Sequence, residues 1–293
     1  MNQDLVSVIM PTFQSGSLIG KAIQSVLSQT YQNIELIVVD NFSTDNTYEV
    51  VSSFDDTRVI YKKIQNEGII SKSRNLGIEI SQGRWIAFLD SDDSWYQNKL
   101  EDCIRIANNY NAEFIYHKMK IISDRFRIRR TIGLSLDPKL SPLENLLFKG
   151  NLIPNSSVFV SKELILKVGP ISEDSQVVTW EDFDFWIRSA KQSDKFFFIN
   201  KVLGSYWLGE GNTSSPIRSI DNSIAIKERI FSNRHFPRWL EYQHAVALYK
   251  ASRYDDSLKI FTNNILFSKN IDKITFKSMI IFILAFLGKL LKR

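Results

Sequence analysis

The stretch WIAFLDSDD, residues 85–93, joins an apolar run typical of a buried strand to an acidic loop. Asp90 and Asp92 lie one residue apart in that loop. Two carboxylates at this place can form a small acidic pocket that suits a hard divalent cation, Mg²⁺ or Mn²⁺, with open positions for phosphate oxygens. An acidic strand end is more often a turn or a helix cap than a metal site, so the rest of the chain has to decide between these interpretations.

Strands alternate with helices on both sides of that stretch. Strand-like apolar runs occupy residues 5–10 (ended by Pro11), 34–40, 59–61, 85–90 and 114–117. Helical patterns occupy residues 17–28, 44–53, 71–81 and 97–110. This alternation predicts an α/β fold, a Rossmann-like, mostly parallel sheet flanked by helices. Ligands of such sheets bind outside the carboxyl ends of the strands, where this chain has Thr12, Asp40 and Asp90-Ser91-Asp92.

The pattern changes in the second half of the chain. Residues 157–161, 196–199 and 202–207 have strand patterns that should complete the sheet, and residues 179–191 have a helical pattern. The polar, glycine-rich loop 209–215 is a candidate lid. Residues 220–268 are helical by pattern, and residues 245–260 fit the bend of a helical hairpin. We therefore expect a main domain over residues 1–215, a helical appendage over 216–270 and a distinct C-terminal segment over 271–293.

The C-terminal segment combines apolar and basic residues. Residues 279–287 (MIIFILAFL) are apolar without interruption, which is short for a membrane span. Lys269, Lys273 and Lys277 recur every four residues and would share one helical face. This segregation favours an amphipathic helix lying on an anionic membrane surface. The alternative is a C-terminal helix that packs on its own domain.

Composition excludes several classes of protein. The single cysteine, Cys103, rules out an intramolecular disulfide framework and fits a reducing compartment. No signal-peptide pattern precedes the first strand. The net charge is +5, but six basic residues fall within the last 25 positions, so the charge does not predict a nucleic-acid-binding face.

Three stretches taken together resemble the family 2 glycosyltransferases with a GT-A fold. They are residues 6–46 (VSVIMPTFQSGSLIGKAIQSVLSQTYQNIELIVVDNFSTDN), 66–93 (NEGIISKSRNLGIEISQGRWIAFLDSDD) and 180–188 (WEDFDFWIR). The resemblance covers about residues 5–215, and the subgroup it points to is bacterial transferases that assemble surface polysaccharides such as O-antigen, capsule or exopolysaccharide. It implies an inverting, metal-assisted transfer of one sugar from a nucleotide-sugar, with a UDP-sugar expected, to a lipid-linked oligosaccharide. The enzyme would be cytoplasmic and peripheral on the inner face of the cell membrane.

The resemblance also implies roles on the donor side. Pro11, Thr12 and Phe13 would line the nucleotide base pocket together with Asp40 and Asn41, and Asp40 would accept a hydrogen bond from the uracil imide. Arg74 and Lys72 would lie near the sugar and phosphates, where a guanidinium suits phosphate oxygens.

The acidic loop matches the Asp-x-Asp motif of the family, Asp90-Ser91-Asp92. Asp92 would contact the metal directly, and Asp90 would contact the ribose or a metal-bound water. Asp93 would cap the segment that follows.

On the acceptor side, the resemblance assigns the catalytic carboxylates to Glu181 and Asp182. An inverting transfer needs one carboxylate near the acceptor hydroxyl to take its proton. We assign this general base to Asp182, with Glu181 binding the acceptor or donor sugar, although the two roles could be exchanged. A helix N-terminus favours carboxylates in any case, so an ordinary acidic first turn is the alternative.

The chain departs from the family pattern at two places. Asp40-Asn41-Phe42-Ser43 stands where relatives usually have Asp-Asp-Gly-Ser, which weakens the prediction of base selectivity. Trp207 and Gly209 stand near the places of an Arg and a metal-binding His in many relatives, and Glu210 could substitute as a ligand. The three histidines lie elsewhere, at positions 117, 235 and 244, where structural or exposed roles are expected.

Three other functions remain as alternatives. A processive synthase would need membrane spans and a Gln-x-x-Arg-Trp motif, and Gln82-Gly83-Arg84-Trp85 has the wrong spacing. A nucleotidyltransferase would need an early glycine-rich phosphate loop, for which Ser15-Gly16-Ser17 is a poor substitute. A non-catalytic scaffold is disfavoured by the presence of both Asp92 and Asp182.

Overall fold

The computed structural model describes residues 4–123, 130–175, 179–209, 215–231, 237–266 and 273–291. The chain divides into two compact units. The first unit comprises Met1–Leu146, Asn151–Glu173 and Glu181–Asn212, and the second comprises Leu147–Gly150, Asp174–Trp180 and Thr213–Arg293. The predicted division at residues 215 and 270 stays a prediction.

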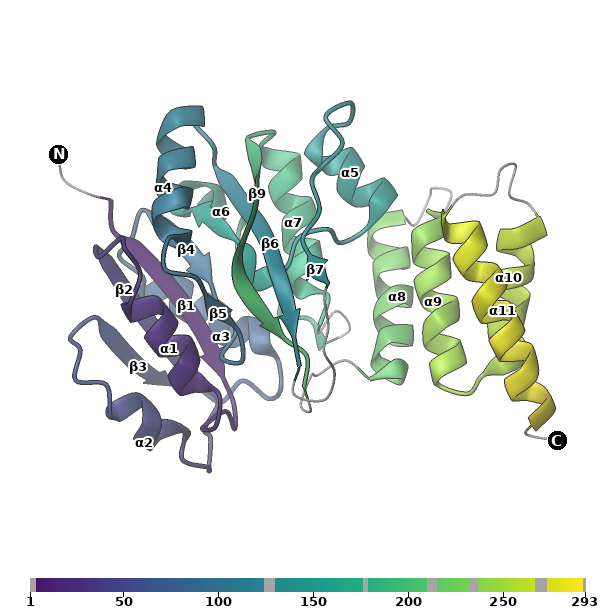
Figure 1. Ribbon diagram of the computed structural model, residues 1–293, viewed down its shortest axis with the longest axis horizontal. Helices are drawn as coiled ribbons and strands as arrows, with labels where there is room; N and C mark the ends of the chain where they lie inside the picture. The colour runs from purple at the N-terminus through teal and green to yellow at the C-terminus, as the bar shows by residue number, and fades with distance from the viewer. Residues whose placement is uncertain are drawn as a thin grey trace. The chain divides into compact units, whose positions relative to one another are not determined.

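The described part of the first unit is built on a nine-stranded sheet (Figure 1). Its strands are β1 Val6–Thr12, β2 Ile34–Asp40, β3 Val59–Lys63, β4 Trp85–Phe88, β5 Ser94–Trp95, β6 Phe114–Ile122, β7 Thr131–Ile132, β8 Phe159–Ser161 and β9 Phe196–Trp207. The order is β3-β2-β1-β4-β8-β6-β9-β5, with β7 paired to β6. The first four strands run parallel, whereas β8 is antiparallel to both β4 and β6. The second half therefore completes the sheet, as the sequence predicts, and makes it mixed.

Helices cover both faces of this sheet (Figure 1). They are α1 Ile19–Leu27, α2 Thr47–Ser52, α3 Ile70–Ile80, α4 Lys99–Tyr110, α6 Lys162–Val168 and α7 Glu181–Gln192, while α5 Pro142–Lys149 ends in the second unit. Alternate residues of β1 (Val6, Val8, Met10) enter one apolar core with α1 and α4, because successive strand side chains point to opposite faces.

Helix α3 lies unusually close to the opposite face of the sheet. A Cβ atom at Gly77 would come within 2.6 Å of Ile9 Cγ2, so only glycine fits this contact without a shift. Arg74 lies three residues earlier on α3, and the close contact holds this arginine near the carboxyl ends of β1 and β4. The packing of α3 therefore positions a charged residue of the site.

Several predicted strand boundaries are wrong. The strand predicted over residues 114–117 extends to Ile122 as β6. Pro11 does not end the first strand, because β1 continues to Thr12 in register with β2. The pairing of β1 with β4 stops at Ile9, so the missing N–H of Pro11 breaks no bond on that side. The two predicted strands 196–199 and 202–207 form one strand, β9, which accommodates its extra residues by a register shift opposite His117 and Lys118.

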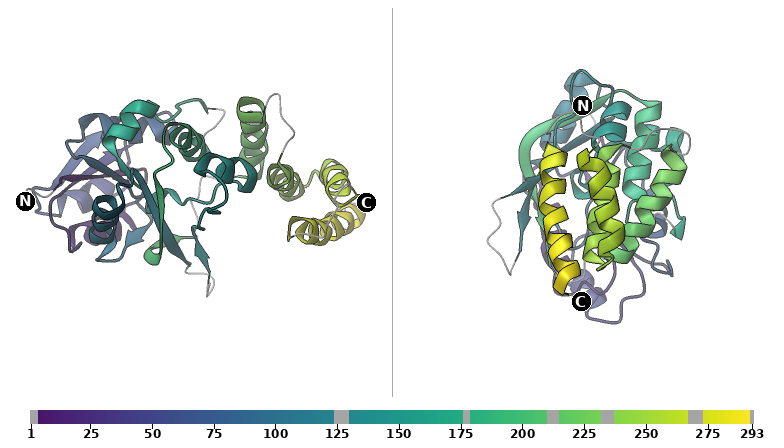
Figure 2. Two further views of the ribbon diagram at one scale, coloured as in Figure 1. Left: turned by 90° about the horizontal axis from the view of Figure 1, so that it is seen from above. Right: turned by 90° about the vertical axis from the view of Figure 1, so that its right-hand side faces the viewer.

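The second unit is helical in its described residues. It contains α8 Pro216–Phe231, α9 Arg238–Lys250, α10 Tyr254–Leu266 and α11 Lys273–Leu291. Figures 1 and 2 show these four helices side by side, with α11 against α9 and α10. The turn between α9 and α10 lies within the predicted hairpin bend at residues 245–260, which confirms that prediction.

Candidate active site

The loop after β4 carries the first group of polar residues. Asp90 accepts a hydrogen bond from Asn155 Nδ2 (3.0 Å) through Oδ1, and its backbone N–H donates to Ser156 Oγ (3.1 Å). Asn155 and Ser156 belong to a short 3₁₀ turn, Asn155–Ser157, that precedes β8. Because β8 is the antiparallel neighbour of β4, this turn comes next to the end of β4. Asn155 belongs to no motif that could be recognised in the sequence, and it lies 65 positions from Asp90.

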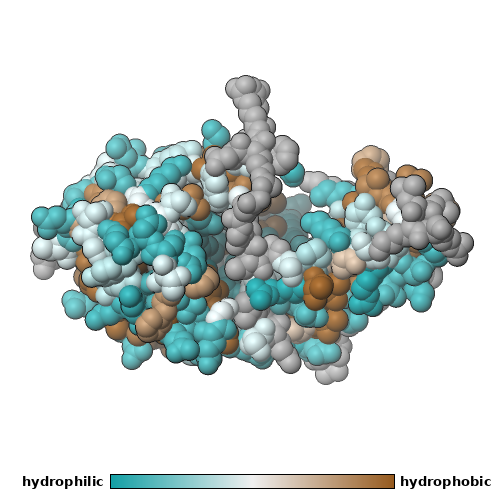
Figure 3. Space-filling model, turned by 90° about the horizontal axis from the view of Figure 1, so that it is seen from below, coloured by the Kyte–Doolittle hydropathy of each residue, from teal (hydrophilic) through white to brown (hydrophobic). Residues whose placement is uncertain are grey.

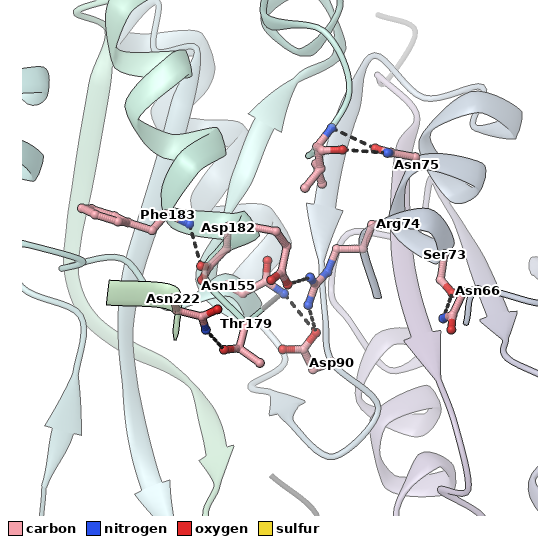
Figure 4. Close-up of polar contacts among 12 residues, drawn as sticks. Asn66, Ser73, Arg74, Asn75, Asp90, Asn155, Thr179, Asp182, Phe183 and Asn222 are labelled. Atoms are coloured by element: carbon pink, nitrogen blue, oxygen red, sulfur yellow. Dashed lines mark hydrogen bonds and ion pairs between the residues drawn. The ribbon is translucent and has the colours of Figure 1, made fainter. Parts of the chain in front are cut away.

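Arg74 connects two carboxylates from distant parts of the chain (Figure 4). Its Nη2 donates to Asp90 Oδ1 (2.8 Å) and its Nη1 to Glu181 Oε1 (2.6 Å). Arg74 is 4% exposed and Glu181 is 5% exposed, so the three charges form a largely buried triad. Burial acts to lower the pKa of Arg74, but the two carboxylates outweigh it and raise that pKa. The guanidinium that the sequence assigned to donor phosphates is therefore engaged by protein carboxylates.

Asp92 lies in the same loop with its carboxylate in a crowded acidic environment. Burial, together with the negative charge of Asp90, raises the pKa of Asp92 to about 6. Ser91 is buried, and its hydroxyl forms a hydrogen bond with the Ser15 hydroxyl (3.1 Å). The acidic loop is thus fixed to the loop that follows β1.

Asp93 does not cap the segment that follows it, and this prediction is wrong. The next element is the strand β5, and the Asp93 carboxylate accepts a hydrogen bond from the backbone N–H of Trp207 (2.8 Å). Its Oδ2 atom is buried and has no hydrogen-bond partner in the described ranges. Burial and the charges of Asp92 and Asp90 raise the pKa of Asp93 well above its ordinary value. Asp93 ties the acidic loop to the end of β9.

A divalent cation fits the carboxylates of the acidic loop only in part. In the described part of the chain, no three His, Cys, Asp or Glu side chains converge into a complete metal site. Burial and, to a smaller extent, the charge of Asp90 raise the pKa of Asp92, and a cation beside the two carboxylates would offset both effects. Two carboxylates with phosphate oxygens and water in the other positions match the way proteins hold Mg²⁺. The donor set therefore fits a cation that is completed by its phosphate ligand.

The two histidines in the described ranges, His117 and His244, do not contribute to this set. His117 is fully buried, and burial lowers its pKa to about 3. His244 forms a hydrogen bond with Ser223 in the second unit (2.6 Å). His235, Glu210 and the greater part of the candidate lid 209–215 lie outside the described residues.

The first turn of α7 presents the second pair of carboxylates. Glu181 is held by Arg74, whereas Asp182 accepts hydrogen bonds from Phe183 N (2.6 Å) and Asn151 Nδ2 (3.4 Å). Burial and the charge of Glu181 raise the pKa of Asp182 to about 7, although Arg74 opposes the shift. A carboxyl group with a pKa near neutrality suits a proton acceptor that works near pH 7.

The predicted base pocket lies at the ends of β1 and β2. Asp40 is fully buried and accepts hydrogen bonds from Tyr61 Oη (2.6 Å) and from the backbone and hydroxyl of Ser43. Thr12 is buried as well, while Phe13 is 55% exposed. The bonds of Asp40 show it shaping its own loop, and its contact with a uracil ring stays a prediction.

Two further residues predicted to bind the donor, Asn41 and Lys72, have protein partners of their own. Asn41 Oδ1 accepts a hydrogen bond from the backbone N–H of Asn66 (2.9 Å), which joins the loops after β2 and β3. Phe42, in place of the usual glycine, is 55% exposed with φ of 50°. Lys72 pairs with the exposed carboxylate of Glu67. Asn41 therefore has a structural partner, and the half-buried Lys72 is paired with an exposed carboxylate rather than with a group of the site.

Known glycosyltransferases resemble this chain in sequence. The model of Glycosyl transferase family 2 matches residues 7–164. The chain is 43% identical over 218 residues to the Escherichia coli protein UDP-Glc:alpha-D-GlcNAc-diphosphoundecaprenol beta-1,3-glucosyltransferase WfgD, covering 73% of this chain and 81% of WfgD. It is 28% identical over 249 residues to the Putative teichuronic acid biosynthesis glycosyltransferase TuaG of Bacillus subtilis, covering 82% of this chain and 94% of TuaG.

A solved structure shares the fold. The crystal structure of S. aureus TarS 1-349 in complex with UDP-GlcNAc superposes with a TM-score of 0.62 at 19% identity, covering 96% of this chain and 81% of TarS 1-349. At this identity the likeness shows the fold alone, and the predicted GT-A architecture is confirmed.

Proposed function

The chain belongs to glycosyl transferase family 2 and is a glycosyltransferase, and we propose that it moves one glucose from UDP-glucose to a sugar carried on a lipid diphosphate. The 43% identity to WfgD supports both substrates, since WfgD is named for UDP-Glc and for GlcNAc-diphosphoundecaprenol. The likeness to TuaG supports a product that belongs to a surface polysaccharide. Membership of this family decides against the nucleotidyltransferase alternative.

One observation carries the proposed mechanism: the buried guanidinium of Arg74 pairs both with Asp90 of the acidic loop and with Glu181 beside Asp182. The loop that would meet the donor diphosphate is thereby connected to the carboxylates that would meet the acceptor. Such preorganisation is what a displacement between two bound substrates requires.

The proposed step is a single displacement with inversion at the anomeric carbon. The acceptor hydroxyl oxygen forms a bond to the anomeric carbon, the bond from that carbon to the diphosphate oxygen breaks, and the electron pair leaves with UDP. Asp182 takes the proton of the hydroxyl, and its pKa of about 7 leaves much of it unprotonated at neutral pH. Asp92 and Asp90 would hold a Mn²⁺ or Mg²⁺ ion that neutralises charge on the diphosphate.

The function is tested by incubating the full chain with UDP-[¹⁴C]glucose, Mn²⁺ and a synthetic GlcNAc diphosphate ester of a short alkyl chain. We expect a labelled disaccharide diphosphate ester, with a β linkage by NMR. GDP-mannose serves as the control donor and should give no product. An α-linked product would contradict inversion, and no product from any UDP-sugar would contradict the proposed function.

If Asp92 binds a metal, its replacement should weaken metal-dependent binding of the donor nucleotide. We expect Asp92→Asn to weaken Mn²⁺-dependent UDP binding by at least about tenfold, since ligand and near-ligand changes commonly cost 10–100-fold in metal affinity. Calorimetry with and without Mn²⁺ measures the effect. Asp55→Asn, an exposed aspartate in the same unit, is the matched control and should bind as the unmodified chain does. Unchanged Mn²⁺ dependence in Asp92→Asn would refute the metal assignment.

The raised pKa of Asp182 predicts the pH dependence of transfer. The base works only when unprotonated, so activity is present above the pKa and is lost as the pH falls through about 7. We expect kcat/KM to fall about tenfold per pH unit on the acidic side of that value. A profile that stays flat down to about pH 5 would show that no base with a raised pKa takes part.

We further propose that α11 attaches the enzyme to the lipid surface that carries the acceptor. Among the residues of α11 whose burial is described, Thr275, Ser278 and Ala285 are buried, and the helix packs against α9 and α10. Figure 3 shows hydrophobic side chains at the surface of the C-terminal helices, and those of α11 are Phe276, Ile280, Ile283, Leu284, Phe286 and Leu287. A helix with small residues inward and large apolar residues outward favours contact with lipid. Among the described helices, none has the length and hydropathy to cross a membrane.

If α11 attaches the enzyme to lipid, binding to vesicles should depend on its exposed apolar residues. We expect the triple variant Phe276→Ser, Ile283→Ser, Phe286→Ser to lose co-sedimentation with vesicles that contain phosphatidylglycerol, because it removes apolar area from the lipid contact. Leu166→Ser, which alters a leucine that is 72% exposed on α6, is the matched control. Equal sedimentation of the two variants would contradict the proposal.

A further inference from the structure

The second unit contains a pocket of its own, with a volume of about 240 Å³. Its walls come from the segment before α7, the start of α8 and one face of α9. The polar and aromatic residues that line it are Trp180, Ser215, Ser219, Tyr242, Gln243 and Lys250. None of these positions belongs to the residues 7–164 matched by the family.

Trp180, which forms an aromatic wall of the pocket, packs against a second tryptophan. Trp180 stacks on Trp239 with ring centroids 6.3 Å apart and an interplanar angle of 22°. Trp239 in turn donates a hydrogen bond from Nε1 to the carbonyl oxygen of Leu147 (2.9 Å). Gly150 has φ of 85°, and a Cβ atom there would come within 2.9 Å of the Trp239 ring. The indole of Trp180 therefore presents a preorganised surface, which reduces the entropy lost on binding.

The charge of the pocket favours an anion. Lys250 is the single charged residue among those that line it, and no carboxylate is present in that lining. Lys250 is an exposed residue, and its ammonium group has no ion-pair partner within the described ranges. An unpaired ammonium group is available to phosphate oxygens as a point charge.

The remaining wall has the chemistry of a sugar site. Tyr242 and Trp180 supply aromatic surface, while Gln243, Ser215 and Ser219 supply an amide and hydroxyls for hydrogen bonds. Sites for small ligands combine such apolar surface with a few polar groups that fix the orientation. Pockets for drug-sized ligands measure about 300–1,000 Å³, so this smaller pocket suits one sugar with its adjacent phosphate rather than an oligosaccharide.

We propose that this pocket binds the head group of the acceptor, with the sugar against Trp180 and Tyr242 and the adjacent phosphate of its diphosphate at Lys250. The proposal rests on the proposed function, which supplies a lipid diphosphate sugar as the acceptor. The chain order supports the acceptor rather than the donor, because Trp180 directly precedes Glu181 and Asp182, the carboxylates assigned to the acceptor side. Gln243 selects among acceptor sugars through its amide, and Lys250 distinguishes a diphosphate from an uncharged aglycone.

The test compares two acceptors on the full chain: GlcNAc diphosphate esterified to a short alkyl chain, and the alkyl glycoside of GlcNAc without phosphate. We expect Lys250→Gln to raise the KM for the diphosphate acceptor about tenfold, since charge-assisted hydrogen bonds are among the stronger ones. The KM for the uncharged glycoside and the KM for UDP-glucose should stay unchanged. Lys259→Gln, which removes an exposed lysine from α10, is the matched control and should alter none of these constants.

A second variant addresses the sugar. Gln243→Ala should raise the KM for both acceptors by a similar factor and leave the KM for UDP-glucose unchanged. If Lys250→Gln and Gln243→Ala both keep the acceptor constants of the unmodified chain, the pocket assignment is overturned and the proposed function stands.

A binding measurement separates this failure from that of the proposed function. Calorimetry with the GlcNAc diphosphate ester and no donor should show about tenfold weaker binding to Lys250→Gln than to the Lys259→Gln control. Equal binding to the two variants overturns the pocket assignment even if the unmodified chain transfers no sugar. If the unmodified chain transfers no sugar but Lys250→Gln binds the ester more weakly than the control does, the pocket assignment holds. In that case only the proposed reaction is refuted.

Discussion

Asp182→Asn is expected to lower the rate of transfer by about 10²-fold or more and to leave UDP binding intact, since a positioned general base commonly contributes 10²–10⁴-fold. The asparagine keeps the size of the side chain and its bond to Asn151, but it cannot take a proton at neutral pH. Its effect should therefore fall on kcat, because the lost interaction belongs to the transition state. Single-turnover transfer and calorimetric titration with UDP measure the two quantities separately.

Glu181→Gln is the informative comparison for this experiment. Glu181 is held by Arg74 and is buried, so its replacement should disturb the triad and reduce stability as well as activity. A dead Glu181→Gln that folds and binds UDP normally, beside an active Asp182→Asn, would show that the two carboxylates have exchanged roles.

Arg74→Met is expected to lower the free energy of unfolding by about 3–5 kcal/mol, the usual cost of removing one partner from a buried ion pair. The substitution leaves the buried carboxylate of Glu181 and the partly exposed carboxylate of Asp90 without their counter-charge, and methionine fills most of the volume. Urea denaturation followed by tryptophan fluorescence measures the change. Transfer should fall as well, because Asp90 and the first turn of α7 lose their common partner.

Lys72→Met is the matched control for that experiment. Lys72 lies two residues before Arg74 on the same helix and pairs with the exposed carboxylate of Glu67. Surface ion pairs typically contribute between 0 and about 1 kcal/mol, so this variant should remain close to the unmodified chain. If Arg74→Met is as stable as Lys72→Met, the triad does not organise the site.

The ion-pair partners of Arg74 could not be predicted from the sequence. The alternation of strands and helices placed Arg74 on a helix beside the predicted site, and the family motif placed Asp90 and Glu181 there as well. Nothing in the sequence indicated that the guanidinium would face those carboxylates rather than donor phosphates. Their distances along the chain are 16 and 107 positions, and such pairs are set by the packing of α3 on the sheet.

Asn151, Asn155 and the contact of Asp93 with Trp207 were missed for the same reason. These groups are ordinary polar residues of loops and turns, with no periodicity and no motif of their own. The antiparallel return of β8 beside β4 brings Asn155 to Asp90, and the end of β9 brings the backbone of Trp207 to Asp93 across 114 positions.

The sequence by itself determined the α/β architecture, the parallel first half of the sheet, the acidic loop and the carboxylate pair, because hydrophobic periodicity and local motifs act within short stretches of chain. Only the tertiary structure decided which carboxylate is held by Arg74, which carboxylate has its pKa raised to about 7, and where Asp93 and Lys250 lie. These outcomes depend on burial and on charges that approach through space, and both arise from long-range packing that no local pattern encodes.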